Sequence, residues 1–363
     1  MVKCLNKTRA KEVLFLFILS TGLLNHVIII PALLEAAGRD AWISVVCVIG
    51  PYILYLLLIF YISKNIKQKS LLKWIEEEYG KFTLVLFSVP MFLLLFSDTY
   101  ITLVDTSIWA KTYFLPETPY LLILLIFIFS CFWLSTRTFK QLTLMATIVL
   151  PIVVFLGFFI MTANFKHKDW ENLFPLFLNG YKPMLKGILY SFSGLIEIFF
   201  LLLVQNHLKS TFKLKQIVFL GLIFVGLTLG PLSASIMEFG PVVSSNLGYP
   251  AYEEWKLLQL GDFISRMDFL AMFQWMSGAL FRISLLMFIL SSFVKEKSRV
   301  KFLSIFYLFL LGAALIPISR FQLHGLLYNY FLPISLIIIF SLSIILFFLV
   351  LINKRKDRSQ NAG

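Results

Sequence analysis

The chain has 363 residues, of which 59% are hydrophobic and only 14% charged, and its formal net charge is +13. Soluble domains carry about a quarter charged residues, so this composition excludes an ordinary soluble protein. The basic residues lie in short connections beside apolar stretches and not in one cluster, which argues against nucleic acid as a partner and for the lipid bilayer.

Ten apolar stretches are each long enough to cross a bilayer, which requires about 20 residues. In chain order they cover residues 12–34, 41–62, 82–110, 119–136, 141–163, 187–205, 216–240, 267–292, 302–319 and 329–352. We therefore predict an all-α integral membrane protein. It would form a single polytopic domain over residues 1–363, with short tails at 1–11 and 353–363.

The positive charge alternates between the two sides of the predicted bundle. Most of the 32 Lys and Arg residues fall in connections on the same side as the N-terminus. Because cytoplasmic loops are enriched in Lys and Arg, both termini are predicted to be cytoplasmic. Residues 63–81 also predict a short amphipathic helix that ends at Gly80, and Tyr252 to Leu260 predict a small helix on the outer side.

The first and sixth stretches are interrupted by polar residues and glycine. Residues 20–26 read STGLLNH and residues 191–194 read SFSG. These breaks occupy corresponding places in two halves, residues 12–163 and 187–352, a pattern typical of transporters whose broken helices bind substrate near the bilayer midplane. We therefore predict ten transmembrane helices in a five-plus-five inverted repeat with discontinuous helices 1 and 6. The alternative is close helix packing through small residues.

Ionisable residues inside apolar stretches are candidates for function because they are costly there. Asp98 and Thr102 share one face of the third stretch, Glu197 follows the second break, and Arg282 lies in the eighth stretch. The predicted ligand-binding set is Ser20, Thr21, Gly22, Asn25, His26, Asp98, Thr102, Ser191, Phe192, Ser193, Gly194, Glu197 and Arg282. The alternative is that Asp98, Glu197 and Arg282 form a structural ion network without ligand contact.

Two further residues have open interpretations. His26 is either a proton-sensitive switch or a buried neutral histidine, and Asp105 could reach the outer interface. The sequence contains no His-Glu-x-x-His, Gly-x-Ser-x-Gly or phosphate-cradling glycine motif. No catalytic residue, cofactor or metal site is therefore predicted, and a membrane enzyme is only the third hypothesis.

Several motifs resemble the amino-acid/polyamine/organocation transporter superfamily. The segment from Gly22 to Trp42 resembles its first-span signature, and SFSGLIE at 191–197 is similar to its sixth-span motif. More specifically, the chain resembles the B subunits of spore germination nutrient receptors. This resemblance rests on its length, its layout, FPLFLNGYKPMLKG at 174–187 and GDFISRMDFLAMFQWMSGALFRISL at 261–285.

The resemblance implies a permease-like protein of the spore inner membrane that binds a small nutrient such as an amino acid. It also implies a complex with a receptor A subunit and a lipoprotein C subunit. Many superfamily members carry Gly-Ser-Gly before the span-one proline, whereas alignment on Pro31 places Leu24-Asn25-His26 there, which would shift the unwound point towards Gly22. The favoured function is nutrient recognition with signalling through partners, and the alternative is a secondary transporter of amino acids or other small organic solutes.

Overall fold

The computed structural model describes residues 7–258 and 267–360. Within these ranges the chain is helical, apart from connections and an isolated parallel bridge between Thr8 and Leu208. Among the described residues, seven helical segments are long and apolar enough to cross a membrane. The class predicted from composition, an all-helical multi-pass membrane protein, is therefore confirmed.

Each predicted apolar stretch overlaps helical segments of the structure. In chain order these are α2 (Ala10–Leu23), η1 (Leu24–Ile28), α3 (Ile30–Ala37), α4 (Ala41–Ile66), α5 (Leu71–Tyr113), α6 (Tyr120–Ser135), α7 (Phe139–Ala163), α8 (Lys182–Leu195), η5 (Ile196–Phe200), α9 (Leu201–Val204), α10 (Leu214–Phe239), α13 (Phe269–Ser291), α14 (Arg299–Ala314), α15 (Arg320–Leu326), η8 (Leu327–Phe331) and α16 (Leu332–Gln360).

Some predicted limits were wrong. The ninth stretch, predicted at 302–319, lies on a helix that starts at Arg299 and stops at Ala314. The helix after it starts at Arg320 and not at residue 329, because Ser319 caps its first turn by accepting a hydrogen bond from the Gln322 amide. Both errors arise because the apolar residues continue past the point where one helix ends and the next begins. Only the polar capping residue Ser319 indicates that the second helix begins there.

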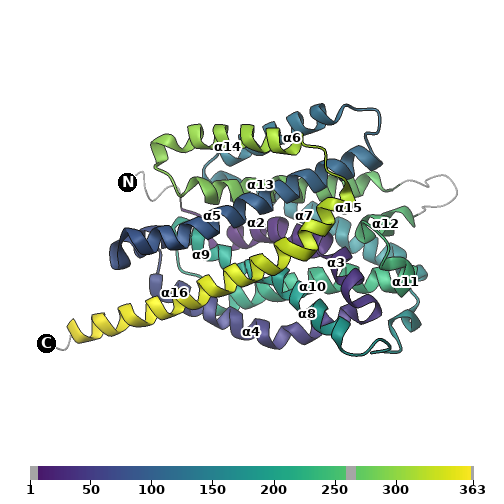
Figure 1. Cartoon of the computed structure of the whole chain (residues 1–363), viewed down its shortest axis with the longest axis horizontal. Helices are drawn as coiled ribbons and strands as arrows, with labels where there is room; N and C mark the ends of the chain where they lie inside the picture. Colours follow the sequence, from purple (N-terminus) through teal and green to yellow (C-terminus); the bar gives the residue numbers. More distant parts are fainter. Residues whose placement is uncertain (1–6, 259–266, 361–363) are drawn as a thin grey trace.

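The long helices run side by side along the longest axis of the molecule (Figure 1). Burial separates central helices from peripheral ones. In the most apolar window of Lys182–His207, 83% of residues are buried, and in that of Phe269–Ser291, 72% are, against 22% for Phe139–His167. The segment α8 to α9 and helix α13 therefore form the centre of the bundle, and α13 packs against α2, α5, α6 and α7.

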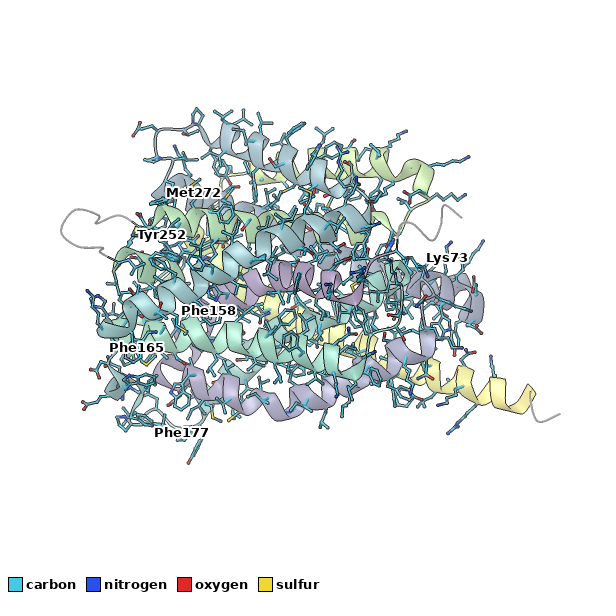
Figure 2. The ribbon with its side chains drawn as sticks, turned by 180° about the vertical axis from the view of Figure 1, so that it is seen from behind. Lys73, Phe158, Phe165, Phe177, Tyr252 and Met272 are labelled. Atoms are coloured by element: carbon cyan, nitrogen blue, oxygen red, sulfur yellow. The ribbon has the colours of Figure 1, made fainter. Side chains whose placement is uncertain are left out.

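Different elements lie at the two ends of the bundle. Helix α16 ends on the side from which α2 starts, while the short helices α11 (Pro241–Ser244) and α12 (Pro250–Lys256) lie at the opposite end (Figure 1). Lys73 and Tyr252 accordingly lie towards opposite ends of the molecule (Figure 2).

Both predicted short helices are present, with changes. The amphipathic helix starts at Leu71 and is separated from the long part of α5 by Gly80, whose backbone is non-helical (φ 82°, ψ 175°). This region of backbone conformation is essentially restricted to glycine, which explains the predicted stop. The outer helix α12 ends at Lys256 and not at Leu260. Residues 259 and 260 of that prediction, and 261–266 of the motif at 261–285, lie outside the described residues.

Candidate functional site

The first predicted break overlaps a change of helical winding, whereas the second, residues 191–194, lies at the end of regular α8 and directly precedes one. After α2 the chain forms the π-helical turn η1, in which the amide of Ile29 donates to the carbonyl of Leu24 over 3.0 Å. After α8 it forms the tighter 3-10 helix η5. Winding changes of these kinds inside longer helices are frequent at functional hinges and sites. The backbone stays helical through both of them.

The π-helical turn η1 meets the end of α8 at Asn25 and Gly194. Asn25 is fully buried, and its Nδ2 donates to the carbonyl oxygens of Thr21 (3.0 Å) and Gly194 (3.2 Å). Its Oδ1 accepts a hydrogen bond of 3.3 Å from the Thr228 hydroxyl on α10. The amide therefore joins three helices through hydrogen bonds in an otherwise apolar interior.

Glycine at position 194 allows this close approach. A Cβ atom there would lie 2.6 Å from Oδ1 of Asn25 and 2.8 Å from Cδ1 of Ile29. Both distances are shorter than a non-bonded contact allows, so any side chain at this position would displace the asparagine. The glycine of the second predicted break is thus explained by packing against the first.

Arg282 of α13 forms a second buried polar cluster, one that draws residues from α2, α5 and η5. The guanidinium is fully buried, and Asp98 and Glu197 are 2% and 3% exposed. Its Nη2 donates to both carboxylate oxygens of Asp98 at 2.7 Å and to Oε1 of Glu197 at 2.6 Å, while Nη1 donates to Oε2 of Glu197 at 2.8 Å. Nε donates to the Thr102 hydroxyl at 3.2 Å and Nη1 to the Ser20 carbonyl at 3.4 Å.

This geometry supports the structural alternative for Asp98, Glu197 and Arg282. All three guanidinium nitrogens have acceptors, and each carboxylate is bound by the guanidinium. A buried charge is tolerated when it is paired and hydrogen-bonded in this way. The charges and hydrogen-bonding groups of the cluster are therefore satisfied without a ligand. The cluster also links four helical segments, which the predicted ligand site requires to lie close together.

The remaining polar residues of the second break are engaged within their own helix. The hydroxyl of Ser191 donates to the carbonyl of Gly187 (2.9 Å) and that of Ser193 to the carbonyl of Leu189 (2.8 Å). Phe192 packs edge-on against the rings of Tyr52 and Tyr55, with centroid distances of 6.2 and 5.8 Å. This side chain thus faces α4, on another side of the helix from Asn25.

Two predicted residues, Gly22 and His26, line a cavity of about 510 Å³. Its walls come from α2, η1, α7, α10, α12 and α13, and most of the lining is apolar. The polar lining includes Glu254 of α12 and Gln274 and Trp275 of α13. The shielded Nδ1 of His26 has no hydrogen-bond partner among the described residues.

The predicted ligand-binding set does not include the outer residues of this cavity. Glu254 belongs to the helix predicted on the outer side, yet its side chain is only 6% exposed. The signal was present in the helical spacing of Tyr252 and Trp255, two aromatic residues three apart that predict one buried face. It did not reveal which helices that face would meet.

Asp105 is also buried and does not reach the outer interface. It is 2% exposed, accepts a hydrogen bond of 2.9 Å from the Tyr249 hydroxyl, and lies 3.2 Å from Nε2 of His324 on α15. This contact ties the outer part of α5 to α15 and to the segment before α12. No residue of the predicted ligand-binding set takes part in it.

The fold and these interior clusters define a multi-pass membrane protein with a polar, hydrogen-bonded centre. The chain belongs to the spore germination protein family, whose model matches residues 5–325. It is 38% identical over 352 residues to "Spore germination protein XB" of Bacillus anthracis, covering 96% of this chain and 99% of that protein. It is also 27% identical over 292 residues to "Putative spore germination protein YfkT" of Bacillus subtilis (strain 168), covering 77% of each chain.

Proposed function

We propose that this chain is the nutrient-recognition subunit of a spore germinant receptor and that it signals through an A subunit and a lipoprotein C subunit. Its nutrient would be a small molecule, in the first instance an amino acid, and its role would be non-catalytic. In this proposal it lies in the spore inner membrane with both termini cytoplasmic. Its ten transmembrane helices form a five-plus-five inverted repeat with discontinuous helices 1 and 6.

The observation that carries the proposal is the hydrogen bond between Asn25 and the carbonyl of Gly194. It joins the π-helical turn of the first apolar segment to the segment that precedes the 3-10 turn of the sixth. A small zwitterion that replaced this bond would insert between the two segments. Once the two helices unwind at these points, backbone amides near Gly22 and Gly194 would receive its carboxylate. Asp98, released from Arg282, or a helix-terminal carbonyl would receive its ammonium.

Signalling requires that the ligand bind two arrangements of the bundle with different affinities. The Arg282 cluster suits this role because it connects α2, α5, η5 and α13 through buried hydrogen bonds. In the proposal, separation of α2 from α8 by the nutrient changes the positions of Ser20 and Glu197 relative to Arg282. The altered packing is then passed to the partner subunits.

The experiment compares two glycine substitutions in spores that carry the full receptor. Gly194→Leu is expected to slow germination by L-amino acids, supplied one at a time, at least tenfold. Its control is Gly312→Leu on α14, where a Cβ meets no atom within 4 Å. Protein levels in the membrane should be equal. A normal response of Gly194→Leu spores would show that the nutrient binds elsewhere.

A second measurement separates the receptor from the secondary transporter. The purified chain alone is reconstituted into proteoliposomes, and uptake of a radiolabelled amino acid that triggers germination is followed. A receptor subunit is expected to bind the amino acid without accumulating it. Uptake that exceeds empty liposomes and that Gly194→Leu abolishes would instead identify a transporter.

A further inference from the structure

Glu254 is an unpartnered carboxylate in the wall of the cavity of about 510 Å³. It is 6% exposed, and its fully shielded Oε1 has no hydrogen-bond partner among the described residues. Burial of an unpaired carboxylate is costly, whereas its neighbour Glu253 is paired with Lys256 at 3.0 Å. The position of Glu254 therefore suits a cation that no described residue supplies.

The surroundings of Glu254 add negative charge. Glu238 at the end of α10 lies close enough for its charge to act on Glu254, and burial together with this charge raises the pKa of Glu254 well above its usual range, opposed by Lys168. The ammonium of Lys168 donates to the Met161 carbonyl at 3.1 Å, and not to either carboxylate. An ammonium group beside Glu254 would oppose this raised pKa and favour the ionised carboxylate.

Asn164 links Glu238 to the backbone of Glu254. Its Nδ2 donates to Oε2 of Glu238 (3.2 Å) and to the backbone carbonyl of Glu254 (2.7 Å). Its Oδ1 is shielded and has no partner among the described residues. Of these three residues it is Glu254 that lines the cavity, and a carboxylate there favours a ligand with N–H donors, such as an ammonium group.

Apart from His26, Gln274 and Trp275, the rest of the cavity is largely apolar, and part of its lining is exposed. Gly226 and Gly230 of α10 are exposed, as is Phe158 of α7. Phe158 lies below Tyr252 of the outer helix in Figure 2. In a multi-pass membrane protein such an exposed lining faces lipid, so a ligand with an apolar tail can enter from the bilayer.

We propose that this cavity binds an amphiphile in which a primary ammonium group is attached to an apolar tail, with the ammonium beside Glu254 and the tail between α7 and α10. The ligand is either a free amphiphilic amine or a lipid with an amine headgroup. The cavity volume lies in the range of about 300 to 1,000 Å³ that small-molecule sites occupy. This site is separate from the Asn25–Gly194 contact, so the inference does not depend on the proposed nutrient site.

The test uses the full chain in nanodiscs of phosphatidylcholine, with octylamine as probe and octanol and octanoate as comparators of equal chain length. Calorimetric titration is expected to give saturable octylamine binding, at least tenfold tighter than that of either comparator. Glu254→Gln should weaken octylamine binding at least tenfold, whereas the matched control Glu253→Gln should leave it unchanged. Equal binding of octanol and octylamine, or of octylamine to Glu254→Gln and wild type, would overturn the proposal.

Nanodiscs that contain phosphatidylethanolamine distinguish the two sources of the ammonium. If this lipid competes with octylamine in the wild type, but not with the residual binding of Glu254→Gln, the resident ligand is a lipid headgroup. If octylamine binds equally well in both kinds of nanodisc, the ligand is a free amine. Because octylamine binding is measured on the purified chain, its failure is distinguishable from a failure of nutrient-triggered germination.

Discussion

Nη2 of Arg282 lies 2.7 Å from both carboxylate oxygens of Asp98, although 184 residues separate the two along the chain. The same nitrogen lies 2.6 Å from Oε1 of Glu197. A single guanidinium thereby holds two carboxylates that would otherwise be buried without a counter-charge. The stability of the bundle should depend on all three groups together.

Replacing Arg282 alone should be strongly destabilising. Arg282→Met leaves two buried carboxylates without a partner, and removal of one partner from a buried ion pair costs about 3 to 5 kcal/mol. The triple variant Arg282→Met/Asp98→Asn/Glu197→Gln removes the uncompensated charge and should recover much of this loss. Thermal unfolding of the purified variants measures both. If the triple variant does not unfold at a higher temperature than the single variant, electrostatic pairing is not the source of the cluster's contribution to stability.

A second prediction concerns the contact of Asn25 with Gly194. Gly194→Ala places a Cβ atom 2.6 Å from Oδ1 of Asn25, and Asn25→Ala removes two hydrogen bonds donated by the buried amide. Each single variant should lose about 1 to 3 kcal/mol. Combined, they should lose less than the sum, because the clash with Oδ1 disappears with the amide while only that with Cδ1 of Ile29 remains. Additive losses in a double-mutant cycle would contradict the contact.

The raised pKa of Glu254 predicts that a neutral side chain stabilises the empty protein at neutral pH. A carboxyl whose pKa is higher in the folded than in the unfolded state loses stability as pH rises above the unfolded value of about 4.3. Burial raises this pKa most, the charge of Glu238 on α10 raises it further and Lys168 opposes them, while Glu253 and Lys256 of its own helix are paired with each other.

Glu254→Gln should therefore raise the free energy of unfolding by about 1 to 3 kcal/mol at pH 7. The gain should shrink as the pH is lowered to about 4, where the wild-type side chain is neutral in both states. The measurement is thermal unfolding over this pH range, without added amine and in phosphatidylcholine. A gain that is constant with pH would mean that ionisation of Glu254 is not the cause.

Gly80 offers a test of backbone conformation alone. A Cβ atom at this position meets no other atom within 4 Å, but the φ of 82° and ψ of 175° are accessible essentially only to glycine. Gly80→Ala should cost about 1 to 3 kcal/mol, whereas Gly312→Ala, on a regular helix, should be neutral or slightly stabilising. Comparable unfolding temperatures of the two variants would argue against a strained turn between the amphipathic helix and the rest of α5.

Much of the helical layout was predictable from the sequence. Apolar runs of sufficient length appear in the structure as helices. Gly80 appears as a turn, the first Gly-bearing break overlaps a change of winding, and the second directly precedes one. The errors fell where apolar character and helix end do not coincide, as at Ser319, whose capping bond starts a new helix inside an apolar region. Hydropathy reflects how favourably a residue is transferred from water to lipid, and it carries little information on individual hydrogen bonds.

The sequence by itself determined that this chain lies in a membrane and which of its polar residues must be kept from lipid, because each of these follows from the transfer energy of a residue and its neighbours along the helix. Only the tertiary structure decided how those residues are paired. Asn25 meets Gly194 across 169 residues of chain, and Arg282 meets Glu197 across 85. Glu254, in contrast, has a buried oxygen, Oε1, without a partner in the part of the chain that the structure describes. Such pairing depends on which helix faces pack together, and this is a property of the whole bundle rather than of any one segment.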